Sequence, residues 1–427
     1  MPPMQNTGAG QGAAVVAAQG LSHSAGAQQR QGWAIALGLA VVLCIIFGTT
    51  LNSLSVFTQP ITSALRCSNE QVARVATAFL ISMTLAMPLA GWLLDRIAPR
   101  PVMTGGALIT ALGYLLAGWS ADIDQLALAV ALSGLGVGAC TYVPAITLVT
   151  RWIPYERQGL AFGLLLAGGS IGAIIFPVLL TEVIAAIGWR GAMQGIAGAI
   201  LLFCVPLLLW TARQPSSQEQ AGQPVMETTS GHGIGQALRL PRYWLWIGMQ
   251  LLLTLSSLGI FIALVPYLIS VGYSAQQAAG LLAASAAAAL VGNFVFGLCS
   301  QRWAAKSILM SSTLVCALGI LCLLAAGDPR LGLAAVVLFI LGWGSTFTLV
   351  NQFAPLLLME ATGARNFASL LGIGNLIAGL GSAFSPEIVG YLVDLTHTYT
   401  LALLLCAGLA AAALLPIALQ GRGPAPQ

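Results

Sequence analysis

Residues that could carry out chemistry are sparse in this sequence and occur in a few places. Charged residues make up 7% of its 427 residues, yet Asp95, Arg96 and Arg100 share one stretch, GWLLDRIAPR (91–100). Two further acids, Glu182 and Glu387, lie in or at the edge of apolar stretches. A carboxyl group in apolar surroundings can bind and release protons, and a charged loop can hold two segments together. Glu387 is the candidate proton site, although either acid could simply lie at the membrane interface.

Catalytic and metal-binding patterns do not occur. His23, His232 and His397 are far apart, and neither CxxC nor HExxH is present. No nucleophile, base and orienting acid can be assembled, and a phosphate-binding G-x-x-x-x-G-K-S/T loop is absent. Of eight cysteines only Cys67 falls in an expected outer loop, so we expect no disulfide. The sequence therefore predicts a protein that is not an enzyme or an ATP-driven pump and that has no cofactor and no metal.

The elements that position these residues are membrane spans. Hydrophobic residues form 58% of the chain and the mean hydropathy is +0.90. Apolar runs of about twenty residues recur, which is the length of a membrane-crossing helix. We therefore predict an all-α membrane protein with twelve transmembrane helices. The expected spans are 33–56, 71–94, 101–119, 125–150, 158–181, 189–211, 243–265, 275–298, 305–326, 331–353, 367–390 and 398–419.

Polar stretches divide the chain into two halves. Residues 1–32 are rich in Ala, Gly, Gln and Ser, lack a signal peptide and are expected to be a disordered tail. A polar linker separates two six-helix bundles, and a short tail ends the chain. The expected domains are 1–32, 33–211, 212–242, 243–419 and 420–427.

The positions of basic residues predict the orientation. If both termini are cytoplasmic, the 16 Lys and Arg residues divide into twelve inside and four outside. The outer four are Arg66, Arg74, Arg190 and Arg330. Because basic residues favour the cytoplasmic side, we expect cytoplasmic termini in a plasma (inner) membrane. No basic cluster suggests a nucleic-acid partner.

An internal repeat supports two homologous bundles. At an offset of 206 residues, unusual residue types come into register. The matched pairs are Pro60 and Pro266, Ser68 and Ser274, Gln71 and Gln277, Gly91 and Gly297, Arg96 and Arg302, and Arg100 and Lys306. A direct repeat of six helices places a binding site between two bundles that can open alternately to either side.

The stretch GWLLDRIAPR resembles the signature loop of the major facilitator superfamily, and GLCSQRWAAK (297–306) resembles a degenerate second copy. This resemblance implies a transporter fold and a loop that couples conformations, with Asp95 facing the positive end of a neighbouring helix. The arginines would pair with carboxylates or lipid phosphates. The coupling residues it implies are Gly91, Asp95, Arg96, Arg100, Arg302 and Lys306.

A second resemblance is to the monocarboxylate transporter and oxalate/formate antiporter branch. It rests on YERQGLAFGLLLAGGSIGAIIFPVLL (155–180) and on CSNEQVARVATAFL (67–80), where Ala73 and Arg74 replace a serine-tryptophan pair. In this branch an arginine that binds the substrate carboxylate precedes the loop glycine by four residues. That position is Asn293 here, and a neutral amide cannot form the charged fork of an arginine.

The family resemblance places helices one, four, seven and ten around the cavity. Hydroxyl groups there can bond to their own helix, but amide and phenol groups need other partners. The predicted substrate-binding residues are Asn52, Tyr142, Asn293, Asn351 and Gln352.

The sequence thus predicts a secondary active transporter for a small organic solute, with a monocarboxylate or related organic acid as the first candidate. Expected partners are that solute, a coupled proton and membrane lipids, and a monomer suffices because the repeats supply both walls of the pathway. Two alternatives remain: an exporter of neutral or amphiphilic compounds, and a solute sensor without transport activity.

Overall fold

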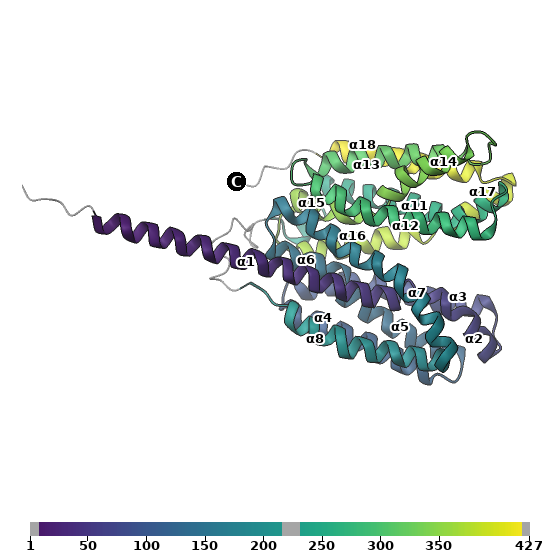
Figure 1. The fold of residues 1–427 in the computed structure, drawn as a ribbon, viewed down its shortest axis with the longest axis horizontal. Coiled ribbons are helices and arrows are strands. Elements are labelled where there is room, and N and C mark those ends of the chain that lie inside the picture. Colours follow the sequence, from purple (N-terminus) through teal and green to yellow (C-terminus); the bar gives the residue numbers. More distant parts are fainter. Residues whose placement is uncertain (1–7, 216–230, 421–427) are drawn as a thin grey trace, which may run out of the picture.

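The computed structural model describes residues 8–215 and 231–420, which are almost entirely helical (Figure 1). Eleven continuous stretches are long and apolar enough to cross a membrane. One of them, Tyr155–Thr211, has 57 residues, or about 85 Å of helix against a hydrocarbon layer of about 30 Å. Gly188 interrupts it with φ 75° and ψ 165°. The stretch therefore holds two spans, and the described chain has the twelve that the sequence predicts.

The first half contains the helices up to residue 211. They are α1 (Gly8–Thr49), η1 (Leu54–Phe57), α2 (Thr58–Leu65), α3 (Asn69–Leu94), α4 (Pro99–Trp119), α5 (Ile123–Cys140), α6 (Tyr142–Trp152), α7 (Tyr155–Ala199), η2 (Ile200–Cys204) and α8 (Val205–Thr211).

The second half follows a short helix, α10 (Ile234–Ala237), that precedes its first span. Its elements are α11 (Pro241–Ser270), α12 (Ala275–Cys299), α13 (Ala305–Leu323), α14 (Gly332–Phe339), η3 (Ile340–Gly344), α15 (Leu349–Thr362), α16 (Phe367–Ser382), α17 (Ser385–Thr396) and α18 (Thr400–Leu419).

Helix α1 begins earlier than expected. The sequence predicted a disordered tail up to residue 32, whereas the structure continues the helix back to Gly8. No proline occurs between Pro3 and Pro60, and alanine is frequent, so nothing in this stretch forces the helix to end. Residues 1–7 of the expected tail, 216–230 of the expected linker and 421–427 of the C-terminal tail lie outside the described residues.

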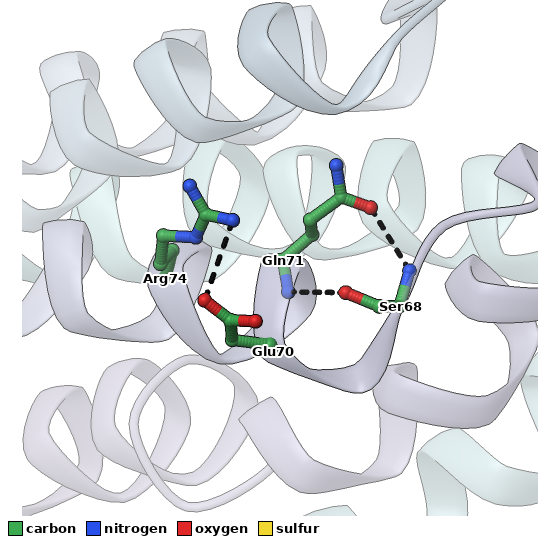
Figure 2. Close-up of polar contacts among 4 residues, drawn as sticks. All are labelled: Ser68, Glu70, Gln71 and Arg74. Atoms are coloured by element: carbon green, nitrogen blue, oxygen red, sulfur yellow. Dashed lines mark hydrogen bonds and ion pairs between the residues drawn. The ribbon is translucent and has the colours of Figure 1, made fainter.

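The two copies of the repeat begin their second span in the same way. In α3 the Ser68 hydroxyl accepts from Gln71 N–H at 3.2 Å, and Gln71 Oε1 accepts from Ser68 N–H at 2.9 Å (Figure 2). Ser274 and Gln277 form the same reciprocal cap on α12, at 3.1 and 2.9 Å. This capping box satisfies N–H groups that a helix start leaves free. Residues that match at an offset of 206 thus have the same structural role.

Three spans are broken. The first is interrupted after α1 at residues 50–53, late in its expected range, and the fourth near its middle at Thr141, where φ and ψ are both −109°. The tenth passes through the π-helix η3 and a turn at Phe347 and Thr348 before α15 starts. Thr141 and Phe347 are 206 residues apart, so the fourth and tenth spans break at equivalent positions. Broken spans expose backbone groups, which makes such points suitable for solute binding.

The halves meet along two helix pairs. Helix α3 packs on α16, and α7 packs on α12 (Figure 1). We call the end of the molecule that carries Asp95 and Arg302 the loop end. Close to it, a Cβ at Gly91 would overlap the carbonyl oxygen of Ala368, and one at Gly372 would lie 2.5 Å from the carbonyl oxygen of Met87. Glycine at these positions lets the two backbones approach.

Candidate functional site

Asp95 joins the halves at the loop end. It follows α3 directly, and its Oδ2 accepts hydrogen bonds from the backbone N–H of Ser369, at 3.0 Å, and from the Ser369 hydroxyl. Ser369 is the third residue of α16, where N–H groups have no partner within the helix and the helix dipole is positive. Asp95 therefore faces the positive end of a helix from the other half, as the family resemblance implied. Its role in coupling stays a prediction.

Arg151 completes this contact, and the sequence alone did not reveal it. In the last turn of α6, its Nη2 donates to the carbonyl oxygen of Leu94 at 3.0 Å, and its charge acts on Asp95. Burial raises the pKa of the Asp95 carboxyl, while the Ser369 bonds and the Arg151 charge oppose that rise. In the sequence, Arg151 is a basic residue at the end of the fourth span, and it was used only to predict the orientation of the spans in the membrane.

The other basic loop residues have different partners from those expected. The guanidinium of Arg96 lies 3.8 Å from the centre of the Trp92 ring, and Arg100 is exposed. Lys306 donates to the carbonyl oxygens of Ala418, at 2.8 Å, and Gln420. These carbonyls end α18, where a helix attracts cations. In the described part of the chain none of these residues pairs with a carboxylate, and pairing with lipid phosphates, the other expected partner, stays a prediction.

A second contact between the halves involves a phenol. Tyr155, the first residue of α7, donates its hydroxyl to Oε1 of Glu360 near the end of α15. Both side chains are half-buried. Sequence reasoning did not single out either residue, because Tyr155 stood in a family motif and Glu360 at the end of an apolar span. The loop end is thus held by two carboxylates, each bound to a donor in the opposite half.

Tyr142 and Asn351 meet at the two equivalent helix breaks. Tyr142 is the first residue of α6, and its hydroxyl donates to the backbone carbonyl of Asn351 at 2.6 Å. It lies ten residues before the end of α6 at Trp152, or roughly 15 Å from the loop end, which is about half of the hydrocarbon thickness. The structure therefore brings two predicted binding residues together near the middle of the membrane.

Asn293 and Gln352 lie between that contact and the loop end. Both side chains are fully buried. The Thr348 hydroxyl donates to Asn293 Oδ1 at 2.9 Å, and Gln352 Nε2 donates to the backbone carbonyls of Gly159 and Asn293, at 2.8 and 3.0 Å. Among the described residues, Asn293 Nδ2 and Gln352 Oε1 have no hydrogen-bond partner. Four of the five predicted binding residues thus form one connected polar cluster: Tyr142, Asn293, Asn351 and Gln352.

Asn52 stands apart from this cluster. It lies at the break after α1, nineteen residues beyond Trp33, the first residue of the expected span. Nineteen residues of helix are roughly 28 Å long, so Asn52 lies toward the far end of that span. The neighbouring hydroxyls of Thr49, Thr50 and Ser53 bond to carbonyls of their own helix. The side chains of Asn52 and Asn351 are half-buried and form no hydrogen bond within the described residues. Both amides are therefore available to a solute, at different depths.

A second amide pair joins Gln250 and Asn375, and sequence reasoning had considered only Gln250. Gln250 of α11 donates from Nε2 to Asn375 Oδ1 at 2.8 Å, and Asn375 of α16 donates to the Leu371 carbonyl. The Oε1 of Gln250 is buried and has no hydrogen-bond partner in the part of the chain that the structure describes. Gln250 stood among the polar residues of a cavity-lining span, but Asn375 did not, because the eleventh span was not expected to line the cavity. Asn375 could have been found from the sequence, because an asparagine within an apolar span needs a hydrogen-bond partner.

The two intramembrane acids lie away from the contacts between the halves. Glu387 is exposed and lines a hollow of about 390 Å³ between α17 and α18, with Tyr391 and aliphatic side chains. Glu182 is exposed on α7. The site between the halves is consequently built from uncharged amides, a phenol and hydroxyls, and its charged groups lie at the loop end. Such a site can orient a polar solute through hydrogen bonds but offers it no formal charge.

Comparison with known proteins agrees with this architecture. The model of the Major Facilitator Superfamily matches residues 36–386. The chain is 26% identical over 404 residues to monocarboxylate transporter 12 of Mus musculus, covering 88% of this chain and 82% of the relative. It is 28% identical over 380 residues to the oxalate:formate antiporter of Oxalobacter formigenes, covering 82% and 84%. These relatives belong to the branch that the two motif stretches resemble.

The fold also matches a solved transporter. The crystal structure of FucP, the E. coli fucose:proton symporter, in the outward conformation aligns with a TM-score of 0.71 at 17% identity, covering 92% of this chain and 100% of that one. At this identity the match speaks for the fold alone. The fold and the relatives are those of membrane transporters and not of enzymes. With its family match, repeated halves and signature loop, the chain belongs to the major facilitator superfamily.

Proposed function

We propose that this protein is a secondary active transporter that moves a small organic acid or a related organic solute across the plasma membrane by alternating access. The observation that carries the proposal is the contact between Tyr142 and Asn351, which joins two equivalent helix breaks, one from each half, at mid-membrane depth. Broken helices at a repeat interface are where carriers of this architecture bind solutes.

The contacts between the halves support a state that is closed at the loop end. The hydrogen bonds across the interface join Asp95 to Ser369, Tyr155 to Glu360, Gln352 to Gly159 and Tyr142 to Asn351. They extend from the loop end to about the middle of the membrane. With both termini cytoplasmic, as the basic residues predict, the loop end is the cytoplasmic side. The solute site would then face outward in this state.

The substrate class is proposed from the relatives and from the site together. The relatives are named for monocarboxylates, oxalate and formate. In this chain the cluster around Asn293 and Gln352 contains no cation, so a carboxylate would be bound by amide and phenol donors. A buried anion without a cation partner is costly to desolvate, so the acid would cross together with a proton. We propose an organic acid held by uncharged donors, with Tyr142 and Asn351 as its contacts at mid-membrane depth and Asn52 as a separate contact at the break after α1.

Coupling to protons is a separate part of the proposal. A carboxylic acid that crosses together with a proton carries no net charge, which suits an uncharged site. Glu387 is the candidate carrier, because its exposed carboxyl adjoins an apolar hollow. A monomer suffices for this mechanism, since the two halves supply both walls of the pathway, and lipids would contact Arg96 and Arg100 at the cytoplasmic face.

The neutral site favours one alternative substrate class. Because Asn293 and its neighbours are uncharged, an exporter of neutral or amphiphilic compounds would use the same cluster. A sensor that binds solute without moving it is a further alternative from another functional class.

The experiment is solute flux into proteoliposomes that contain the purified protein and an internal pH dye. The panel covers monocarboxylates, dicarboxylates, amino acids and neutral solutes, and protein-free vesicles are the control. Uptake of a monocarboxylate with internal acidification supports the proposal. Flux of neutral solutes alone overturns the acid assignment, and binding measured by thermal shift without any flux supports the sensor.

A further inference from the structure

A single amide side chain, that of Gln352, bridges the two halves between the proposed solute site and the loop end. We infer that Gln352 is a positioning residue whose amide clamps the loop end shut and whose release accompanies opening to that side. The inference rests on the proposed alternating-access function, because only a carrier that opens at the loop end needs to break this clamp.

The donor atom of Gln352 is shared between the halves. Its Nε2 donates to the carbonyl oxygen of Gly159 on α7, at 2.8 Å, and to that of Asn293 on α12, at 3.0 Å. An amide nitrogen has two N–H groups, so both bonds form at once. Since α7 belongs to the first half and α12 to the second, one side chain ties the two helices together.

Glycines make this bridge possible. A Cβ at Gly163 would lie 2.7 Å from Gln352 Nε2 and 2.6 Å from the carbonyl oxygen of Asn293. One at Gly297 would lie 3.1 Å from the same Nε2, and one at Gly159 would overlap the Ser300 hydroxyl. Larger side chains would fill the space through which the amide reaches both backbones. The small residues therefore give the amide access as well as allowing close helix packing.

The clamp is continuous with the solute site. Tyr142 donates to the carbonyl of Asn351, the residue directly before Gln352. Two successive residues of α15 thus receive contacts from the first half, one through its backbone and one through its side chain. Asn293 lies six residues before the end of α12, roughly 9 Å from the loop end, whereas Tyr142 lies roughly 15 Å from it. A solute that binds Tyr142 or Asn351 therefore acts on the same helical turn that carries the clamp.

The clamp is also incomplete, which keeps it reversible. Gln352 Oε1 and Asn293 Nδ2 are buried in the closed state, and no described residue forms a hydrogen bond with either atom. Opening would expose both atoms to water and remove that desolvation cost, while breaking the bond to Gly159. Opening thus loses one hydrogen bond and restores the hydration of two polar atoms. These two changes oppose each other, so the free energies of the closed and open states stay close. A carrier requires such a balance, because it must visit both states in every cycle.

Gln352→Met tests the clamp, because methionine keeps the length of the side chain and removes its donors. Gln158→Met is the matched control. Gln158 is also buried, and its Nε2 also donates to two carbonyls, those of Ile153 and Thr150, but both belong to the first half. Hydrogen–deuterium exchange is measured without solute on the full chain in nanodiscs, at residues 293–303 and 367–372, to which Gln158 donates no hydrogen bond.

We expect Gln352→Met to speed exchange in both segments roughly tenfold, because two hydrogen bonds are lost and the carbonyls of Gly159 and Asn293 are left without their donor. Gln158→Met should leave both segments at the wild-type rate. Equal rates in Gln352→Met and wild type would overturn the clamp.

If Gln352→Met does not fold, Gly163→Ala serves instead, since its added Cβ pushes on both Nε2 and the Asn293 carbonyl. It should speed exchange in the same segments, and an unchanged rate would again contradict the clamp. The exchange measurement needs no solute, so it is independent of the flux panel. A protein that shows no flux but has the expected exchange pattern would contradict the proposed function and still support the clamp.

Discussion

The Asp95 carboxylate at the end of α3 binds the backbone N–H and the hydroxyl of Ser369 at the start of α16. The two residues are 274 positions apart in the chain and lie in different halves. Arg151 stands beside them and donates to the carbonyl that precedes Asp95. Asp95 and the carbonyl before it therefore connect three helices at the loop end, and the protonation of the carboxylate bears directly on whether that end is closed.

Replacing the Asp95 carboxylate should change the balance between the closed and the open loop end. The substitution removes a favourable interaction with a helix N-terminus, worth up to about 2 kcal/mol in partly buried sites, and it also removes the cost of burying a charge. We expect Asp95→Asn to reduce solute flux roughly five- to thirtyfold, measured in proteoliposomes. The control is Asp122→Asn, because Asp122 Oδ1 accepts from Gln125 N–H at 2.8 Å within the first half only. Equal losses in the two variants would mean that the effect is one of helix stability.

The closed loop end should bind protons. Burial raises the pKa of Asp95 in this state, and exposure in the open state returns it toward the ordinary value of about 3.9. The closed state therefore holds more protons, so acidification toward that raised pKa favours closure, and raising the pH favours opening. Exchange at 367–372, corrected for its intrinsic pH dependence, should slow as the pH falls. Asp95→Asn should abolish this change, and its persistence would assign the effect to another group.

The Tyr142 hydroxyl should matter for transport more than for folding. Tyr142→Phe removes one bond across the interface, worth about 1 kcal/mol, and a candidate solute contact. We expect roughly fivefold lower flux with a changed apparent KM. Tyr267→Phe is the matched control, because its hydroxyl donates to the Leu323 carbonyl at 2.8 Å inside the second half. A KM that stays at the wild-type value in Tyr142→Phe would remove Tyr142 from the solute site.

A methyl group at Gly91 should prevent full closure. The added Cβ would overlap the Ala368 carbonyl, and overpacking of this kind costs about 1–3 kcal/mol. Gly91→Ala should therefore speed hydrogen exchange at 367–372 and lower flux. In Gly195→Ala the new Cβ meets nothing within 4 Å, so exchange and flux should match the wild type. A wild-type flux in Gly91→Ala would show that the close approach of α3 and α16 is dispensable.

Glu387 is tested by separating solute exchange from net uptake. If it carries the coupled proton, Glu387→Gln keeps exchange of labelled for unlabelled solute and loses solute-driven acidification of the vesicle. This is the outcome we expect from an exposed carboxyl beside an apolar hollow. Asp394→Asn, at an exposed acid on the same helix, is the control and should keep both activities. Normal acidification in Glu387→Gln would assign this acid to the membrane interface.

The sequence by itself determined the membrane fold and its repeat. Hydrocarbon leaves backbone groups no partner except their own helix, so each span must appear as a long apolar run that can be read directly. The register of 206 residues predicted equivalent positions, and the structure has the same cap at Ser68 and Ser274 and equivalent breaks at Thr141 and Phe347. Asp95 at the start of a neighbouring helix followed from the family motif.

Only the tertiary structure decided which groups on different helices meet. Hydropathy carries no information on which face of a helix lies against another helix, because lipid-facing and buried faces are equally apolar. Arg151 next to Asp95, Tyr155 with Glu360, and Asn375 with Gln250 were therefore not predictable. The partners of Gln352 were not predictable either. An amide side chain in a membrane span needs hydrogen-bond partners, but the sequence does not say which. The carbonyls of Gly159 and Asn293 are its partners because the packing of α7 against α12 brings both backbones within reach of the amide.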